Sequence, residues 1–371
     1  MKVGVLTSSR ADYSIYLPLL KALQSDSYFE LSVIAFGTHL SQEFGYTVNQ
    51  IKQDGFTVDY EQNTTPLGYE PNDIATSIGN TVNLFSNYWT NSNYDIVFAL
   101  GDRYEMYAAC TATIPFNIPL AHIHGGEITL GAIDDVFRNC ISLMAKVHFP
   151  VAKVYKERLV QLLGNNSNIY NVGSLSYDTL NEVELYDIPK FLQIFNIDLT
   201  LKSILITYHP ETVNYNDNEK HIKELLAALH TLNHYQLIIT MPNADTMGNL
   251  IRSSIINFAL TRPNVKCIES FGTIGYLTCM KYCSFLLGNS SSGFAEAAFF
   301  PKTVVNIGDR QKGRLSTPNI IHTITSKDAI LSAITQAENM HQIQAIDTYG
   351  NGTAATQIIN ILKNELATAH H

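Results

Sequence analysis

Acidic and imidazole side chains follow two apolar stretches in the first half of the chain, in a spacing that suits proton transfer. Asp102 comes directly after the first stretch, and His124 and Glu127 come just after the second, with Asp134 a short way further on. Such side chains act as general acids and bases when they lie at a reacting carbon. A structural role is the alternative for the aspartates, because an acidic residue at the start of a helix can simply cap it.

His122 and His124 raise the question of a metal site, because alternate residues of a strand point to the same face. Together with Glu127 they offer three potential ligands, but this spacing is a weak metal signal. The adjacent glycines Gly125 and Gly126 instead favour a backbone that approaches a ligand closely. No Gly-x-Gly-x-x-Gly follows the first predicted strand, and the chain has no P-loop pattern. We therefore expect no metal ion and no cofactor.

A segment of small and hydroxyl residues in the second half predicts a diphosphate site. Ser290 and Ser291 follow an apolar stretch, and Glu296 lies about one turn into the helix expected after it. Amide groups at such a turn can receive an anion, and a carboxylate in that first turn can hold the two hydroxyls of a ribose. Arg310 lies in a basic loop after the next apolar stretch and adds a cation to the predicted site.

Two more polar clusters come directly after predicted strands. Arg10 follows the first strand, where it can pair with an anion, although helix capping beside a surface arginine explains the cluster equally well. His209 follows the first strand of the second half and can hydrogen-bond a phosphate. Ligands of open α/β sheets bind outside the carboxyl ends of the strands, which is where all these residues are expected.

Short apolar runs alternate with amphipathic segments almost throughout, which predicts βαβ units and parallel sheets. Strands are expected at 2–7, 31–36, 96–100, 120–123, 148–150, 203–208, 235–240, 265–268, 285–287 and 303–307. The clearest helices are expected at 16–24, 74–89, 104–114 and 219–232. The pattern restarts after a polar region at 181–201. We therefore predict an α/β protein with two Rossmann-like, doubly wound domains that face each other across a cleft.

The composition narrows the class of protein. The 371 residues suit about two domains, and 46% hydrophobic with 15% charged residues suits well-buried cores. The net charge of −9 argues against a nucleic-acid surface. No apolar run approaches the roughly 20 residues that span a bilayer, and the five cysteines are loosely spaced. We expect a cytoplasmic protein with reduced thiols that binds neither nucleic acid nor a membrane.

Several of these segments together resemble those of the hydrolysing UDP-N-acetylglucosamine 2-epimerases. The matching segments are 9–13, 101–105, 122–127, 209–212, 288–293, 308–314 and 349–352, in the order of the family. The resemblance covers essentially the whole chain. It implies a GT-B-like fold with an N-terminal Rossmann-like domain at 1–180, a UDP-binding domain at 181–350, and a C-terminal helix within 351–371 that crosses back to the first domain. It also suggests a homodimer or homotetramer.

The resemblance implies a reaction and a set of roles as well. Such enzymes release UDP from UDP-N-acetylglucosamine and form N-acetylmannosamine for sialic acid synthesis, by anti elimination to 2-acetamidoglucal and hydration with inversion at C2. Asp102, Glu127 and Asp134 are then expected to transfer protons. The expected contacts to UDP and the sugar are Arg10, His39, His209, Asn243, Ser290, Ser291, Glu296 and Arg310.

His124 departs from the family pattern, since some relatives carry a glutamate at this position. Either His124 or Glu127 is expected to take over the proton transfer of that glutamate. The departure also leaves the substrate open between UDP-N-acetylglucosamine, which we favour, and the UDP-2,4-diacetamido-2,4,6-trideoxyglucose of the legionaminic acid pathway. The same segments also fit a GT-B glycosyltransferase that uses the same UDP site, or a non-catalytic UDP-sugar sensor.

Overall fold

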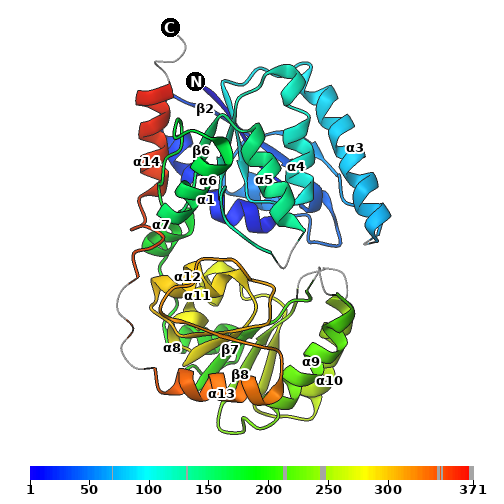
Figure 1. Ribbon diagram of the computed structural model, residues 1–371, viewed down its shortest axis with the longest axis vertical. Coiled ribbons are helices and arrows are strands. Elements are labelled where there is room, and N and C mark those ends of the chain that lie inside the picture. Colours follow the sequence, from blue (N-terminus) through cyan, green and yellow to red (C-terminus); the bar gives the residue numbers. More distant parts are fainter. Residues whose placement is uncertain are drawn as a thin grey trace. The chain divides into compact units, whose positions relative to one another are not determined.

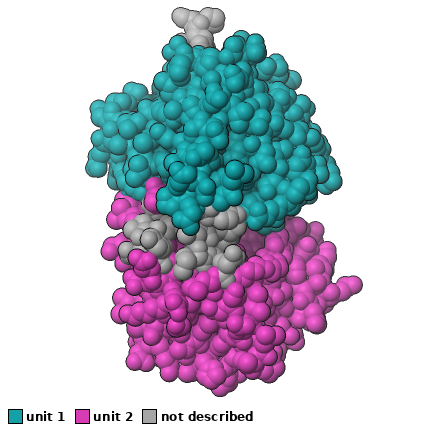
Figure 2. All heavy atoms as spheres, turned by 90° about the vertical axis from the view of Figure 1, so that its right-hand side faces the viewer, with its two compact units in different colours: residues 1–127, 134–181, 348–371 teal, residues 128–133, 182–347 magenta. Residues whose placement is uncertain are grey.

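The computed structural model describes residues 1–68, 70–130, 133–211, 215–242, 248–340, 343 and 346–366. The chain divides into two compact units, which Figure 2 shows in different colours. Unit 1 consists of Met1–Glu127, Asp134–Asn181 and Thr348–His371, and unit 2 consists of Ile128–Ile133 and Glu182–Asp347. None of the described helices combines the length and the apolar character needed to cross a membrane.

Unit 1 is built on a six-stranded sheet in the order β3-β2-β1-β4-β5-β6, in which all neighbours are parallel. Its strands are β1 Lys2–Thr7, β2 Glu30–Phe36, β3 Val58–Gln62, β4 Ile96–Leu100, β5 Leu120–Ile123 and β6 Val147–Phe149. Its helices are α1 Arg10–Ser25, α2 Val48–Gln53, α3 Pro71–Trp89, α4 Tyr104–Thr111, α5 Asp134–Met144, α6 Lys153–Leu163, α7 Leu175–Glu182 and α14 Ala354–Ile361. This strand order is that of a Rossmann-like sheet.

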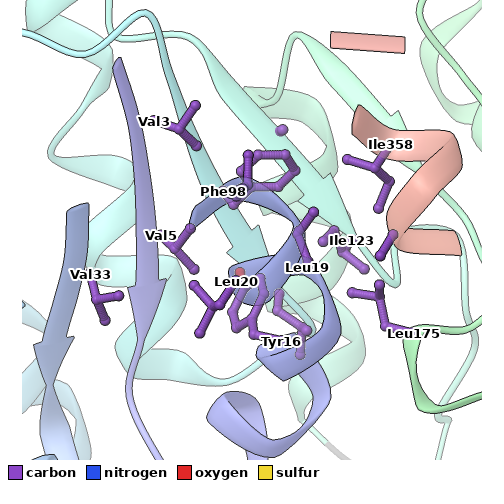
Figure 3. Packing of buried hydrophobic residues seen from close by; sticks show 14 of the residues in the cluster. Val3, Val5, Tyr16, Leu19, Leu20, Val33, Phe98, Ile123, Leu175 and Ile358 are labelled. Carbon is purple, nitrogen blue, oxygen red and sulfur yellow. The ribbon is translucent and has the colours of Figure 1, made fainter. Parts of the chain in front are cut away.

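Helices cover both faces of this sheet, so its central strands are apolar on both sides. Val3 and Val5 of β1 pack towards α1 and α14, as the close view in Figure 3 shows, whereas Leu6 packs towards α3 and α4. In Figure 1, α3, α4 and α5 lie on one side of unit 1 and α1 and α14 on the other. Each fully buried side chain of this kind contributes about 1.5–3 kcal/mol by leaving water.

Unit 2 repeats the same architecture, with a six-stranded parallel sheet in the order β12-β11-β10-β7-β8-β9. Its strands are β7 Ser203–Thr207, β8 Gln236–Thr240, β9 Val265–Ile268, β10 Phe285–Gly288, β11 Val304–Ile307 and β12 Ile320–Thr323. Its helices are α8 Ile188–Phe195, α9 Asn218–Leu229, α10 Gly248–Leu260, α11 Gly272–Tyr282, α12 Ala295–Phe299 and α13 Lys327–Glu338. The predicted α/β, GT-B-like fold with two Rossmann-like units is confirmed.

The last helix of the chain belongs to unit 1. Ile358 of α14 joins the core that α1 and the sheet form, and the helix continues as a π-helical turn at Leu362–Leu366. Its N-terminus is held from α7, because the buried carboxylate of Asp178 accepts hydrogen bonds from the amides of Ala354 and Ala355, at 3.0 and 2.9 Å. A carboxylate at this end of a helix satisfies amides that have no partner within the helix.

Removal of that carboxylate is expected to loosen the C-terminal helix. We expect Asp178→Ala to lower the free energy of unfolding of unit 1 by about 2 kcal/mol, because two buried amides lose their acceptor. The single tryptophan, Trp89, lies in α3 of unit 1, so its fluorescence in a urea titration reports this transition. The matched control is Asp187→Ala, which removes an exposed N-cap from α8 in unit 2 and should leave the Trp89 transition unchanged. If the urea midpoint measured by Trp89 fluorescence is the same in Asp178→Ala as in the unmodified protein, the expectation is contradicted.

Candidate active site

The polar residues of unit 1 lie after three strands that are neighbours in the sheet. β1 pairs with β4, and β4 pairs with β5, all in parallel. Parallel neighbours end at the same edge of a sheet, so the loops after β1, β4 and β5 lie side by side. These loops carry Arg10, Asp102 and His124, and α5 reaches them through the side chain of Arg138.

Asp102 forms an ion pair with Arg138 of α5. The Arg138 side chain is only 2% exposed, against 23% for Asp102, so the guanidinium is the buried partner. It also donates to Asp135 Oδ1 at 3.2 Å and to the carbonyl oxygen of Glu127 at 3.0 Å. Arg158 lies on the other side of Asp135, with Nη2 3.7 Å from Oδ2. This network pairs Asp102 with a buried cation and ties the loop after β5 to α5.

Asp134 begins α5 and is half-buried. Its negative charge is one of several that raise the pKa of Arg103, after the larger effect of Glu105. Glu105 is buried and accepts from Arg103 Nε at 2.8 Å. Burial raises the pKa of Glu105, and the Arg103 charge opposes that rise. A second carboxylate–arginine pair therefore stands beside Asp102 at the start of α4.

His124 and Glu127 form a close pair, with His124 Nδ1 2.6 Å from Glu127 Oε1. The Glu127 side chain is 4% exposed. His124 has a positive φ of 66°, and Gly126 has one of 80°, so the chain turns sharply directly after β5. Gly126 cannot be replaced without a shift, because a Cβ there would lie 3.0 Å from Leu159 Cγ in addition to meeting the carbonyl of Tyr155. The two predicted proton-transfer residues of this loop are therefore brought together.

His122 has a structural role. Its Nε2 donates to the carbonyl oxygen of Gly101 at 2.8 Å, and its Nδ1 accepts from the Ser142 hydroxyl at 3.0 Å. Burial lowers the pKa of His122 to about 3, which keeps the ring neutral. The ring thus joins the ends of β4 and β5 to α5. Within the described ranges, no group of three or more His, Cys, Asp or Glu side chains is arranged to hold a metal ion.

The two remaining residues expected to bind ligand in unit 1 differ in exposure. His39 follows β2 and is fully buried, with its ring nitrogens 2.9 Å from Thr7 Oγ1 and 2.8 Å from Thr47 Oγ1. Burial lowers its pKa to about 4. Arg10 is exposed in the first turn of α1, next to the N-cap Ser9. His39 therefore fixes the loop after β2, whereas Arg10 is accessible to an anion.

In unit 2, Asn289 organises the predicted diphosphate site. It is fully buried directly after β10, where its Oδ1 accepts from the amide of His209 at 2.7 Å and its Nδ2 donates to the His209 carbonyl at 2.8 Å. Its own carbonyl oxygen accepts from Arg310 Nη1 at 3.0 Å and from Gln311 Nε2 at 2.9 Å. β7, β10 and β11 are neighbours, so His209, Ser290 and Arg310 come together at one edge of the sheet.

The charges of this cluster favour an anion. Burial, together with the nearby Arg310 charge, lowers the pKa of His209 to about 3, so the ring is neutral and can donate one hydrogen bond. Ser290 caps the turn Ser291–Gly293, and its hydroxyl lies 3.0 Å from that of Ser292. Tyr276 in turn holds Ser292 at 2.6 Å. Cationic Arg310 and the hydroxyl groups form the part of the cluster that can meet a phosphate.

One expectation about this cluster is corrected. The sequence predicts a helix after β10 with Glu296 about one turn into it, but the segment forms a 3-10 turn followed by α12, which has five residues and begins directly before Glu296. So short a helix contributes little dipole. Glu296 lies in its first turn and is half-buried. Asn243 lies outside the described residues.

Sequence reasoning missed Arg138 and the functions of Asn289 and Glu211. Glu211 is buried; its amide donates to Asn218 Oδ1 at 2.9 Å, and its carboxylate accepts from the Asp309 amide at 3.1 Å. It therefore fixes the loop that carries Arg310. The only local signal for Arg138 is the i, i+3 spacing from Asp135, which is common on helix surfaces.

Comparison with known proteins gives consistent matches. The family described as UDP-N-acetylglucosamine 2-epimerase matches residues 21–363. GDP/UDP-N,N'-diacetylbacillosamine 2-epimerase (hydrolyzing) of Campylobacter jejuni is 36% identical over 86% of this chain and 83% of its own. UDP-N,N'-diacetylbacillosamine 2-epimerase (hydrolyzing) of Legionella pneumophila is 32% identical over 98% of this chain and 95% of its own. The same fold occurs in the structure of UDP-GlcNAc 2-epimerase from Neisseria meningitidis bound to UDP-GlcNAc, with a TM-score of 0.82. The two sequences are 21% identical, and the match covers 98% of this chain and 99% of that one.

Proposed function

The chain belongs to the UDP-N-acetylglucosamine 2-epimerase family, and on that premise we propose that it is a hydrolysing 2-epimerase of a UDP-linked 2-acetamido sugar. The observation that carries the proposal is the pairing of two chemistries in one chain. Unit 1 holds His124, Glu127 and Asp102 at one edge of its sheet for proton transfer, and unit 2 gathers Arg310 and Ser290 for a diphosphate. Inversion at C2 through elimination of UDP needs proton transfer at C2 and stabilisation of the departing diphosphate.

The proposed reaction has two steps. A base removes the proton from C2, the C2–H electron pair forms a C1=C2 double bond, and the C1–O bond breaks with its electron pair going to UDP. Water then adds, with its hydroxyl bonding to C1 while C2 receives a proton on the face opposite to the one that lost it. The sum is one UDP-sugar and one water converted to UDP and the 2-epimeric free sugar. Positioned general acids and bases speed such proton transfers by about 10²–10⁴-fold each.

We propose that the groups of unit 2 stabilise the departing UDP. Arg310 supplies the positive charge, and the hydroxyls of Ser290 and Ser291 supply donors. The neutral ring of His209 adds one further hydrogen bond. Glu296 is proposed to bind the ribose hydroxyls, and Arg10 of unit 1 to bind a phosphate. Donors aimed at a developing charge are among the largest contributions to catalysis.

The comparisons change the order of the two candidate substrates. We propose UDP-N,N'-diacetylbacillosamine, a 2,4-diacetamido-2,4,6-trideoxyglucose, as the first candidate, in place of the UDP-N-acetylglucosamine that we favour from the sequence alone. Two relatives that are named for it are 36% and 32% identical to this chain. UDP-N-acetylglucosamine is the second candidate, because the family is named for it and it is the ligand bound in the Neisseria meningitidis structure. The two sugars share the 2-acetamido group and the diphosphate on which the reaction depends, and they differ at C4 and C6.

NMR analysis of the products tests the proposal. The chelator-treated protein is incubated with each UDP-sugar separately, without an acceptor. Release of UDP together with the free 2-epimeric sugar supports the proposal, and the sugar that turns over identifies the substrate. A requirement for an acceptor would move the chain to the glycosyltransferases, and binding without turnover would make it a sensor.

Arg310→Ala is expected to weaken UDP binding. Loss of a hydrogen bond to a charged group costs about 1.5–3 kcal/mol, which corresponds to a roughly 10- to 100-fold higher dissociation constant for UDP. Isothermal titration calorimetry measures it directly. The control is Lys312→Ala in the same loop, since the Lys312 side chain is 62% exposed and pairs only with Asp309 among the interactions described, at 3.8 Å. Equal UDP affinity in the Arg310 variant and the unmodified protein would contradict the assignment.

A further inference from the structure

The two ring nitrogens of His124 have different surroundings. Nδ1 lies 2.6 Å from the Glu127 carboxylate, whereas Nε2 is buried and has no hydrogen-bond partner among the residues that the structure describes. A buried polar atom left without a partner is costly, so such atoms concentrate where function requires them. We infer that His124 Nε2 is the base that accepts the C2 proton and that Glu127 is the positioning residue that orients it; the inference rests on the proposed function.

The chemistry of Glu127 determines which nitrogen can act. An ionised carboxylate only accepts hydrogen bonds, so Nδ1 carries the hydrogen in the neutral ring. Nε2 then holds a lone pair and is the proton-accepting atom. A carboxylate bonded to one ring nitrogen also stabilises the imidazolium that forms when the other nitrogen takes up a proton, as in hydrolases with a carboxylate–histidine pair. The distance of 2.6 Å is short for a hydrogen bond from nitrogen to oxygen, in the direction expected when the acceptor is charged.

The neighbouring groups are less suited to accept the proton. Both nitrogens of His122 are engaged, and burial holds that ring neutral with a pKa of about 3. Asp102 is already in an ion pair with the buried Arg138, and protonation of the carboxylate would remove that pairing. Asp135 lies between Arg138 and Arg158.

The backbone holds the pair in place. His124 adopts a φ of 66°, a conformation that is unfavourable for a residue other than glycine. Gly126, with a φ of 80°, packs so closely against the backbone of Tyr155 that no side chain fits there. The positive φ values and the packing of Gly126 against Tyr155 thus define the turn after β5. This turn brings the side chains of His124 and Glu127, three residues apart, together.

The proton-transfer step follows from this geometry. The Nε2 lone pair takes the C2 proton, the C2–H electron pair becomes the C1=C2 double bond, and the C1–O electron pair leaves with UDP. His124 is then an imidazolium next to the Glu127 carboxylate, and it returns its proton to solvent before the next cycle. No oxidant, metal or further reactant enters the balance of this step.

His124→Asn tests the inference, because asparagine tolerates a positive φ and the turn should therefore fold. We expect kcat to fall by about 10³-fold or more, with UDP affinity changed by less than about threefold. His234→Asn is the matched control, since His234 is exposed in unit 2. The turnover of this control variant should equal that of the unmodified protein. Turnover within about tenfold of the unmodified protein in His124→Asn overturns the inference.

Glu127→Gln provides a second readout if His124→Asn does not fold. The amide lacks the charge that stabilises the imidazolium, so kcat should fall by roughly 10²–10⁴-fold and the acid limb of the kcat/KM profile should move to lower pH. The groups that set this limb around His124 are Glu127, Asp102, Asp135, Arg138 and Arg158, with His122 neutral. An acid limb that does not move overturns the positioning role. Failure of the unmodified protein to turn over either UDP-sugar would refute the proposed function itself, which is a different outcome.

Discussion

Arg138→Met is expected to abolish turnover and to lower the free energy of unfolding of unit 1 by about 3 kcal/mol. Arg138 is 2% exposed and binds Asp102, Asp135 and the carbonyl of Glu127 at once. Methionine fills similar volume but leaves two partly buried carboxylates with less compensation. It also releases the loop that carries Glu127, so the site is lost together with stability. Trp89 fluorescence in urea measures the stability, and UDP release measures the turnover.

A double-mutant cycle separates the two effects. Asp102→Asn alone should abolish turnover and leave UDP affinity within a few-fold, because the ion pair and the carboxylate are lost but unit 2 is unchanged. The double variant Asp102→Asn with Arg138→Met removes both partners and should recover about 1–2 kcal/mol relative to the sum of the single variants, without recovering activity. Strict additivity of the two stability changes, or turnover in Arg138→Met close to that of the unmodified protein, would exclude this network from the mechanism.

The parallel sheets were predictable because their central strands are buried on both faces. β1, β4, β7 and β10 read as short apolar runs, and the structure confirms them. The strands at two of the edges were missed: β3 alternates between half-buried and exposed residues, and β12 is only partly buried. An edge strand has one neighbour in the sheet and carries little apolar signal in its sequence. A single sequence therefore predicts the central strands of such a sheet better than its edge strands.

The positions of the candidate site residues were predictable where these residues follow strands, and not elsewhere. Asp102, His124 and Ser290 follow apolar runs, so we expected them at the carboxyl edges of the sheets, and the structure places them there. Arg138 could not be found in this way, because it pairs with Asp102 from a helix 36 residues later in the chain. The two hydrogen bonds between Asn289 and His209 join residues that are 80 positions apart, so no short sequence motif predicts them either. The sequence likewise did not indicate that His39 is buried and supports the loop after β2; its expected contact with the sugar stays a prediction.

Gly288, at the end of β10, is expected to tolerate no side chain. Gly288 has a φ of 140° and pairs with Thr207 of β7, and an added Cβ would lie 2.7 Å from the carbonyl carbon of Thr207, with the carbonyl oxygen closer still. Backbone atoms of two central strands cannot move apart cheaply. We expect Gly288→Ala to lower the free energy of unfolding of unit 2 by about 4 kcal/mol or more. Its calorimetric transition should fall by roughly 10 °C.

The same change should also disable UDP binding, because Gly288 precedes the residue that assembles the site. Separation of β10 from β7 would break the hydrogen bond from the Asn289 amide to the Thr207 carbonyl, at 3.0 Å. The hydrogen bonds between the Asn289 side chain and the backbone of His209 would then be lost as well. The control is Gly79→Ala in α3, where an added Cβ meets nothing within 4 Å and should stabilise the helix by about 0.5–1 kcal/mol. A Gly288→Ala protein that keeps both its unit 2 transition and its UDP affinity would mean that β7 and β10 can separate at this point, and the rigid placement of Arg310 and Ser290 could not then be the basis of UDP binding.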